Sequence, residues 1–197
     1  VWGVVTCDEK GVPGVVVSDG ELVAKTDSRG IYQLPSAKKW NYVFISVPSG
    51  YEVPSKGVLP QFHAYLGADA SSVERQDFEL TYVGDQSKHK MLFLGDMHLA
   101  NRNNDKSQFA VFAKDFNSYR KSHKSEKVYA MTLGDMTWDI YWYKNKYAFP
   151  EYLDEINGQV SGIQIFHTMG NHDNDYELRG AIGTFGADYD ASARYVR

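Results

Sequence analysis

The sequence predicts a small N-terminal β-sandwich over residues 1–84, followed by an α/β domain over residues 85–197. Two observations carry this prediction. The first region consists of short β-branched runs that are broken by Gly and Pro turn signals and show no helical period. The second region contains three apolar runs that each end in Asp, Asn or His, with helical patterns between them, which is typical of alternating strands and helices.

Turn signals divide the N-terminal region into short strands. Asp19-Gly20 and the segment 27–30 are turn sequences, and a polar stretch at 82–89 marks the boundary between the two domains. Prolines at positions 48, 54 and 60 exclude a regular central strand or helix across residues 48–62. The strands are predicted at residues 1–6, 15–18, 21–26, 31–35, 42–47 and 76–81.

The α/β region alternates buried strands with amphipathic helices. The strands are predicted at 90–96, from 128 to about 133, and at 162–169. A helix is expected over 107–122, capped by Asp105 or Ser107, and a second from Phe149 or Pro150 to Gln159. Strand, helix and strand in this order predict right-handed crossovers and a parallel sheet. Residues 174–197 are expected to be mostly loop, with a short helix near 190–196.

Composition excludes several functional classes. The net charge is −4 without a Lys/Arg block, so no nucleic-acid footprint is expected. No run of 18 apolar residues is present, so no transmembrane segment is expected. The chain opens in a strand pattern, so we expect no signal peptide in it. Cys7 is the single cysteine and is expected to be a small buried hydrophobe.

Polar residues that can bind metal follow each predicted strand of the α/β region. Parallel strands place their carboxyl ends at one edge of a sheet, where ligands bind. Asp96 and His98 follow the first strand, Asp135 comes 39 positions after Asp96 (135 − 96), and Asn171 and His172 begin 36 positions later (171 − 135). An Asp between two ions about 3.5–4 Å apart can bridge them, and such ions clamp a phosphoryl group and acidify a bound water. Taken singly, each residue is equally well explained by capping or turn chemistry.

Three segments carry a family resemblance: Gly95-Asp96-Met97-His98, Gly134-Asp135-Met136-Thr137-Trp138-Asp139 and Gly170-Asn171-His172-Asp173. They resemble the D-x-H, G-D-x-x-x-D and G-N-H-[DE] signatures of the calcineurin-like metallophosphoesterases. Residues 14–20, 26–32 and 44–51 are similar to the β-sandwich that precedes such domains in secreted phosphoesterases of Bacteroides-type bacteria.

The resemblance implies hydrolysis of a phosphomonoester or phosphodiester by a metal-bridging hydroxide, with two divalent or trivalent ions (Mn, Fe or Zn). The substrate would be a small phosphate ester or a cell-envelope phosphodiester, and the location periplasmic or extracellular. Asp139 and Asp173 would orient the ligands from behind. The implied roles at the centre are first-metal ligands Asp96 and His98, the bridging ligand Asp135, the second-metal ligand Asn171, and the catalytic His172 beside the leaving group.

One departure from the family pattern concerns the later ligands. The family supplies a further lone His and a G-H-x-H segment, whereas the six histidines here are at 63, 89, 98, 123, 167 and 172. We therefore expect an incomplete α/β domain that lacks its C-terminal part, a site that retains metal poorly, and weak or no activity.

Alternative functions remain open at this point. The chain could serve as a non-catalytic secreted binding or stalk module, or as a pseudoenzyme. Tyr141-Trp142-Tyr143 could line a substrate rim or simply pack against the sheet. His167 lies within a strand pattern and is interpreted as a core histidine with satisfied ring nitrogens, and His63 as a structural or surface residue.

Overall fold

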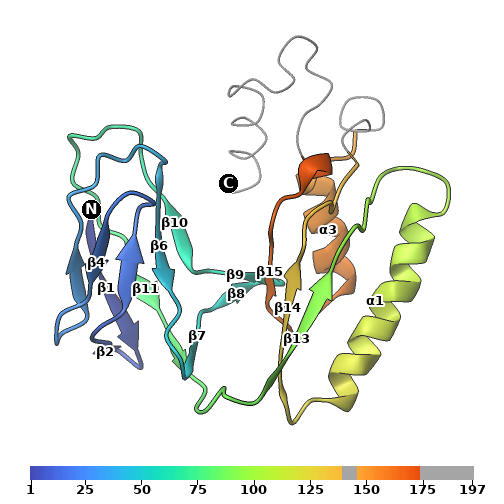
Figure 1. The fold of residues 1–197 in the computed structure, drawn as a ribbon, viewed down its shortest axis with the longest axis horizontal. Coiled ribbons are helices and arrows are strands. Elements are labelled where there is room, and N and C mark those ends of the chain that lie inside the picture. Colours follow the sequence, from blue (N-terminus) through green and yellow to red (C-terminus); the bar gives the residue numbers. More distant parts are fainter. Residues whose placement is uncertain (139–145, 174–197) are drawn as a thin grey trace. The chain divides into compact units, whose positions relative to one another are not determined.

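The computed structural model describes residues 1–138 and 146–173. The chain forms two compact units, one of Val1–Lys56 with Pro60–Ser87 and one of Gly57–Leu59 with the chain from Lys88 (Figure 1). The predictions for Asp139, for 141–143 and for 190–196 lie outside the described residues. Within the described ranges, none of the helices combines the length and apolar character needed to cross a bilayer.

The first unit is β-rich, as predicted, and contains two four-stranded sheets. In one sheet, the first strand of the chain pairs in parallel with β11 and antiparallel with β2 and β5. Its strands are β1 (Trp2–Cys7), β2 (Lys10–Gly11), β5 (Ile31–Gln33) and β11 (Phe78–Glu79). The other sheet has the order β10 (His63–Tyr65), β6 (Tyr42–Ser46), β3 (Val16–Ser18) and β4 (Val23–Lys25).

Strand alternation builds the core of the first unit. Val17 pairs with Ile45 and both are buried, because alternate residues of β3 and β6 point to the same face. Val5 and Phe78 of the other sheet belong to the same buried cluster, so the two sheets share one core. The predicted turn at 27–30 is confirmed: the Asp27 carboxylate accepts hydrogen bonds from the backbone N–H groups of Arg29 and Ile31, at 2.8 and 2.9 Å.

The proline-containing segment forms only two-residue strands, consistent with the limits that proline places on sheets. These are β7 (Tyr51–Glu52), which pairs with β12 (Thr81–Tyr82), and β8 (Ser55–Lys56), which pairs with β9 (Leu59–Pro60). Strand β10 was not among the predicted strands, and it pairs with β6 through His63 opposite Phe44.

The second unit contains the predicted parallel sheet, in the order β13 (His89–Leu94), β14 (Lys127–Thr132) and β15 (Ile165–Phe166). Helix α1 (Asp105–Ser122) connects β13 to β14, and helix α3 (Phe149–Gln159) precedes β15. Leu94, Ala130 and Ile165 lie on neighbouring strands and are buried in one cluster with apolar residues of both helices. The helices therefore fix the sheet whose strand ends form the site described below.

Helix boundaries confirm one prediction and correct another. Helix α3 has the predicted bounds, with Pro150 in its first turn. The prediction that Asp105 or Ser107 caps α1 is wrong, because Asn104 occupies the N-cap position with a left-handed φ of 75° and makes no side-chain cap. The Asp105 carboxylate instead accepts hydrogen bonds from the Ala100 N–H and the Arg102 Nε, at 3.2 and 2.7 Å. The predicted third strand is also shorter than expected, spanning only Ile165–Phe166.

Three residues from the first half of the chain complete the second unit. Val58, on the segment Gly57–Leu59, is fully buried in the core of that unit. Its N–H donates to the Asn157 side-chain carbonyl at 2.9 Å, and its carbonyl accepts from the Ile165 N–H at 2.8 Å. The domain boundary near residue 84 stays a prediction. A single boundary does not account for residues 57–59, which belong to the second unit.

Candidate metal centre

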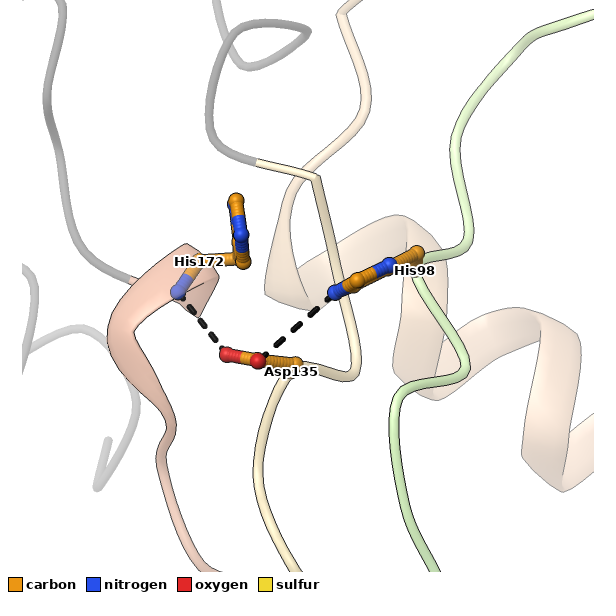
Figure 2. A group of neighbouring side chains, drawn as sticks. All are labelled: His98, Asp135 and His172. Atoms are coloured by element: carbon orange, nitrogen blue, oxygen red, sulfur yellow. Dashed lines mark hydrogen bonds and ion pairs between the residues drawn. The ribbon is translucent and has the colours of Figure 1, made fainter.

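The ends of the three parallel strands bring together one residue from each following loop. His98 follows β13, Asp135 follows β14, and His172 lies in the 3-10 helix η1 (Asn171–Asp173) after β15 (Figure 2). One ligand atom from each of these three side chains lies within 4.8 Å of the others. Residues separated by more than 70 positions therefore meet at one point, as the parallel arrangement predicts.

The loops at this point have a strained backbone. Asp96, His98 and Asp135 have φ values of 52°, 46° and 54°, which is the left-handed region that non-glycine residues rarely adopt. Such residues cost about 1–3 kcal/mol each and persist only where the surroundings fix them. The first two loops are fixed to each other by hydrogen bonds from the His98 N–H to the Asp135 carbonyl and from the Leu99 N–H to the Met136 carbonyl, both 2.9 Å.

Two glycines allow the loops after β14 and β15 to touch. A Cβ on Gly134, whose φ is 97°, would lie 2.6 Å from the Gly170 Cα. A Cβ on Gly170 would lie 2.2 Å from Oδ1 of Asp135 and 2.5 Å from its backbone nitrogen. Because both Cβ atoms are absent, the Asp135 carboxylate can approach the third loop and accept a hydrogen bond from the His172 N–H at 2.9 Å.

The spacing of the donor atoms can be compared with that of metal ligands and of hydrogen-bond partners. His98 Nε2 lies 3.6 Å from Oδ2 of Asp135, too long for a hydrogen bond. This ring nitrogen is buried and has no hydrogen-bond partner among the described residues. Metal–ligand distances near 2.1 Å place adjacent ligands of a tetrahedral ion roughly 3.4 Å apart. His98 and Asp135 therefore fit two ligands of one divalent ion, and His172, whose ligand atom lies within 4.8 Å of both, is near enough to supply a second imidazole.

Three aromatic rings gather at this group. The Trp138 indole stacks on the His172 ring at 4.6 Å with an interplanar angle of 12°, and meets the His98 ring edge-on at 4.8 Å and 82°. The two imidazoles contact each other at 4.7 Å and 71°. The Arg102 guanidinium lies over the indole, 5.3 Å from a ring centroid.

Asp173 links the loop after β14 to the loop after β15 by hydrogen bonds. Its carboxylate is fully buried and accepts hydrogen bonds from the Thr137 N–H at 2.9 Å, the Thr137 hydroxyl at 3.1 Å and the Gly170 N–H at 2.8 Å. Burial raises the pKa of this carboxyl above its usual value, and these hydrogen bonds act in the opposite direction. The contacts hold the loop backbone on both sides of Asp135 and His172.

The roles predicted for Asp96, Asn171 and Asp139 stay predictions. Asp96 is exposed, and its carboxylate is not part of the group of three. Asn171 is exposed at the start of η1, and Asp139 lies outside the described residues. His172, expected beside the leaving group, has a ligand atom within 4.8 Å of those of His98 and Asp135.

His167 agrees with its interpretation as a core histidine with satisfied ring nitrogens. Its Nδ1 lies 3.0 Å from the Ile165 carbonyl, which can only accept, so Nδ1 carries the proton. Its Nε2 then accepts from the Tyr152 hydroxyl at 3.1 Å. Burial lowers the pKa of this histidine to about 4, which keeps the ring neutral near pH 7.

Sequence reasoning assigned no role to Trp138 or Arg102. Trp138 occupies a variable position of the G-D-x-x-x-D segment, so the pattern itself gives it no function. Arg102 belongs to no motif, yet it donates to the His98 carbonyl at 2.6 Å and to the Asp105 carboxylate.

Comparisons with known proteins agree with this geometry. Residues 89–196 match a family model described as calcineurin-like phosphoesterase. Residues 1–83 match one described as the N terminal of calcineurin-like phosphoesterase. A search of curated proteins and a search of solved structures each gave no match.

Proposed function

Because the chain belongs to the calcineurin-like phosphoesterase family, we propose that it binds a divalent metal ion between His98, Asp135 and His172 and hydrolyses phosphate esters there. The observation that carries the proposal is the convergence of these side chains from three successive strand ends. The proposal agrees with the family, whose members act on phosphate esters.

The metal would supply Lewis-acid activation of water and of a phosphoryl oxygen when bound. Two imidazoles and a carboxylate suit borderline ions such as Zn, Mn and Fe. Asp135 presents its two oxygens differently: Oδ1 is occupied by the His172 N–H, whereas Oδ2 faces His98 Nε2. This hydrogen bond orients the carboxylate before any ion arrives, which lowers the cost of ordering it.

The proposal is tested by metal binding and turnover in the same samples. Isothermal titration with Co²⁺ and Mn²⁺ would be combined with hydrolysis of p-nitrophenyl phosphate and bis(p-nitrophenyl) phosphate, which separates monoesterase from diesterase activity. Asp135→Asn keeps the shape of the side chain and removes its charge, so metal affinity should fall more than about 100-fold, with turnover falling in parallel. Asp115→Asn, on the exposed surface of α1, is the matched control and should change neither.

His172 is tested by the same pair of measurements. As a ligand, its replacement by Asn should lower metal affinity and turnover together. As the proton donor to the leaving oxygen, which is the role implied by the family signature, its replacement should lower turnover about 10²–10⁴-fold at unchanged metal affinity. For the metal site as a whole, the deciding variant is Asp135→Asn. If this variant keeps wild-type metal affinity and wild-type turnover, the proposed site is wrong.

A further inference from the structure

Trp138 contacts both imidazoles of the metal centre at once. Its ring is parallel to His172 and perpendicular to His98, with centroid separations of 4.6 and 4.8 Å. Offset-stacked and edge-to-face contacts are the two arrangements that aromatic rings prefer. The single indole therefore favours one plane for each imidazole, and the two planes differ by 71°.

His98 depends on such ring contacts for its orientation. A metal-binding histidine usually donates its second ring N–H to a carboxylate or carbonyl, which fixes the ring plane and the tautomer. In the part of the chain that the structure describes, no hydrogen bond to either ring nitrogen of His98 is found, and Nε2, the atom that would bind the metal, faces Oδ2 of Asp135 at 3.6 Å. Its contacts with Trp138 and His172 take the place of that hydrogen bond.

The indole is restrained by its backbone neighbour and by a cation over its ring. Its neighbour Thr137 is fully buried, with its N–H and hydroxyl both bonded to Asp173. On the other side, the Arg102 guanidinium lies 5.3 Å from the indole, and it is fixed by hydrogen bonds to Asp105 at 2.7 Å and to the His98 carbonyl at 2.6 Å. A ring anchored in this way can hold its neighbours in place.

We propose that Trp138 is a positioning residue that sets the orientation of His98 and His172 and so completes the metal site. The inference rests on the proposed binding of metal by these histidines and is independent of whether the chain hydrolyses a phosphate ester. Removal of residues that orient metal ligands lowers metal affinity about 10–100-fold, and we expect this loss for Trp138→Ala. Trp138→Phe keeps a flat ring in the same place and should lose less than about 10-fold.

The experiment measures Co²⁺ binding by calorimetry and by tryptophan fluorescence, without reference to turnover. The chain has four tryptophans. Co²⁺ quenches a nearby indole, so an ion at this site should quench the Trp138 emission, and this component should be missing in Trp138→Phe. Trp40→Phe is the matched control, because Trp40 in the first unit contacts Lys39 and Glu21 rather than a histidine, and its loss should leave the quenching intact.

The outcomes separate this inference from the proposed function. If Co²⁺ binds the wild type and Asp135→Asn abolishes binding, but both Trp138 variants bind like the wild type, the metal site stands and the positioning role is overturned. If Co²⁺ binds Asp135→Asn as tightly as the wild type, the metal site itself is wrong. Far-ultraviolet circular dichroism identifies a Trp138→Ala variant that fails to fold, and the Co²⁺ affinity of Trp138→Phe then decides, because wild-type affinity in that variant overturns the positioning role.

Discussion

Replacing Gly170 by Ala is the sharpest perturbation of the metal centre, because it adds one methyl group at the closest approach of two loops. The new Cβ would lie 2.2 Å from Oδ1 of Asp135 and 2.5 Å from the Asp135 backbone nitrogen. A carboxylate oxygen could move away with its side chain, but the backbone nitrogen cannot move alone. Either the loops after β14 and β15 separate or the Asp135 side chain turns away from the His172 N–H.

The two responses have comparable costs. Forcing an extra methyl group into a packed site costs about 1–3 kcal/mol. Breaking a hydrogen bond to a charged group costs about 1.5–3 kcal/mol. Since either response relieves much of the clash, we expect Gly170→Ala to lower the unfolding free energy by about 2–3 kcal/mol. Metal affinity should fall with it, because the carboxylate that faces His98 would be displaced.

The assay is urea denaturation followed by circular dichroism, together with Co²⁺ titration. Gly158→Ala is the matched control, since Gly158 lies in α3 and a Cβ there would meet nothing within 4 Å. That substitution should raise stability by up to about 1 kcal/mol, as expected for Gly replaced by Ala in a helix, at unchanged metal affinity. A Gly170→Ala protein with wild-type stability and wild-type metal affinity would refute the close approach of the two loops.

Three further outcomes are expected. His167 has its folded pKa lowered to about 4 from 6.5, so the unfolded state binds more protons between these values and stability falls as the pH is lowered. The loss should reach about 2 kcal/mol at pH 5, and His167→Gln should abolish it in urea titrations at pH 7 and pH 5. Asp96→Gly relieves a left-handed φ of 52° and should raise stability by up to about 1 kcal/mol at unchanged Co²⁺ affinity, whereas a 10-fold loss of affinity would support the predicted role of Asp96 as a ligand. Thr137→Val removes one of the donors to buried Asp173 and should cost about 1–2 kcal/mol in thermal or urea unfolding, and no loss would contradict the described hydrogen bond.

Local patterns were sufficient where the chemistry is local. The bounds of α3 follow from Pro150 in its first turn and from the period of its apolar residues. The meeting of His98, Asp135 and His172 follows from strand ends in a parallel sheet, a rule that needs only the order of the elements. The turn at Asp27 was equally readable, because Asp accepts hydrogen bonds from the backbone two and four residues later.

The backbone of the first loop could not be predicted from spacing alone. Asp96 and His98 are two positions apart, which would place them on one face of an extended strand. Both residues instead have left-handed φ values, so the chain turns between them. His98 lies in the group of three with Asp135 and His172, and the role of Asp96 as a ligand stays a prediction. No sequence pattern encodes that turn, because the strain at these positions is held by hydrogen bonds that the first loop donates to carbonyls of the next loop.

Contacts between segments that are far apart in the chain could not be predicted from the sequence either. Val58 and Asn157 are 99 positions apart, and their hydrogen bond depends on the packing of the whole second unit. Trp138 acquires its contacts in the same way, from loops that follow three different strands.

The placement of Val58 has a practical consequence for anyone who cuts or recombines this gene. The polypeptide enters the second unit at Gly57, leaves it after Leu59 and returns at Lys88. Truncation at a single position therefore cannot separate the complete second unit from the first. A truncated protein that starts at Lys88 would lack Val58. It would lose the Val58 carbonyl that accepts the hydrogen bond from the Ile165 N–H, and the Val58 side chain that packs in the core of the second unit. Chimeras that join another N-terminal domain to this second unit should therefore retain residues 57–59.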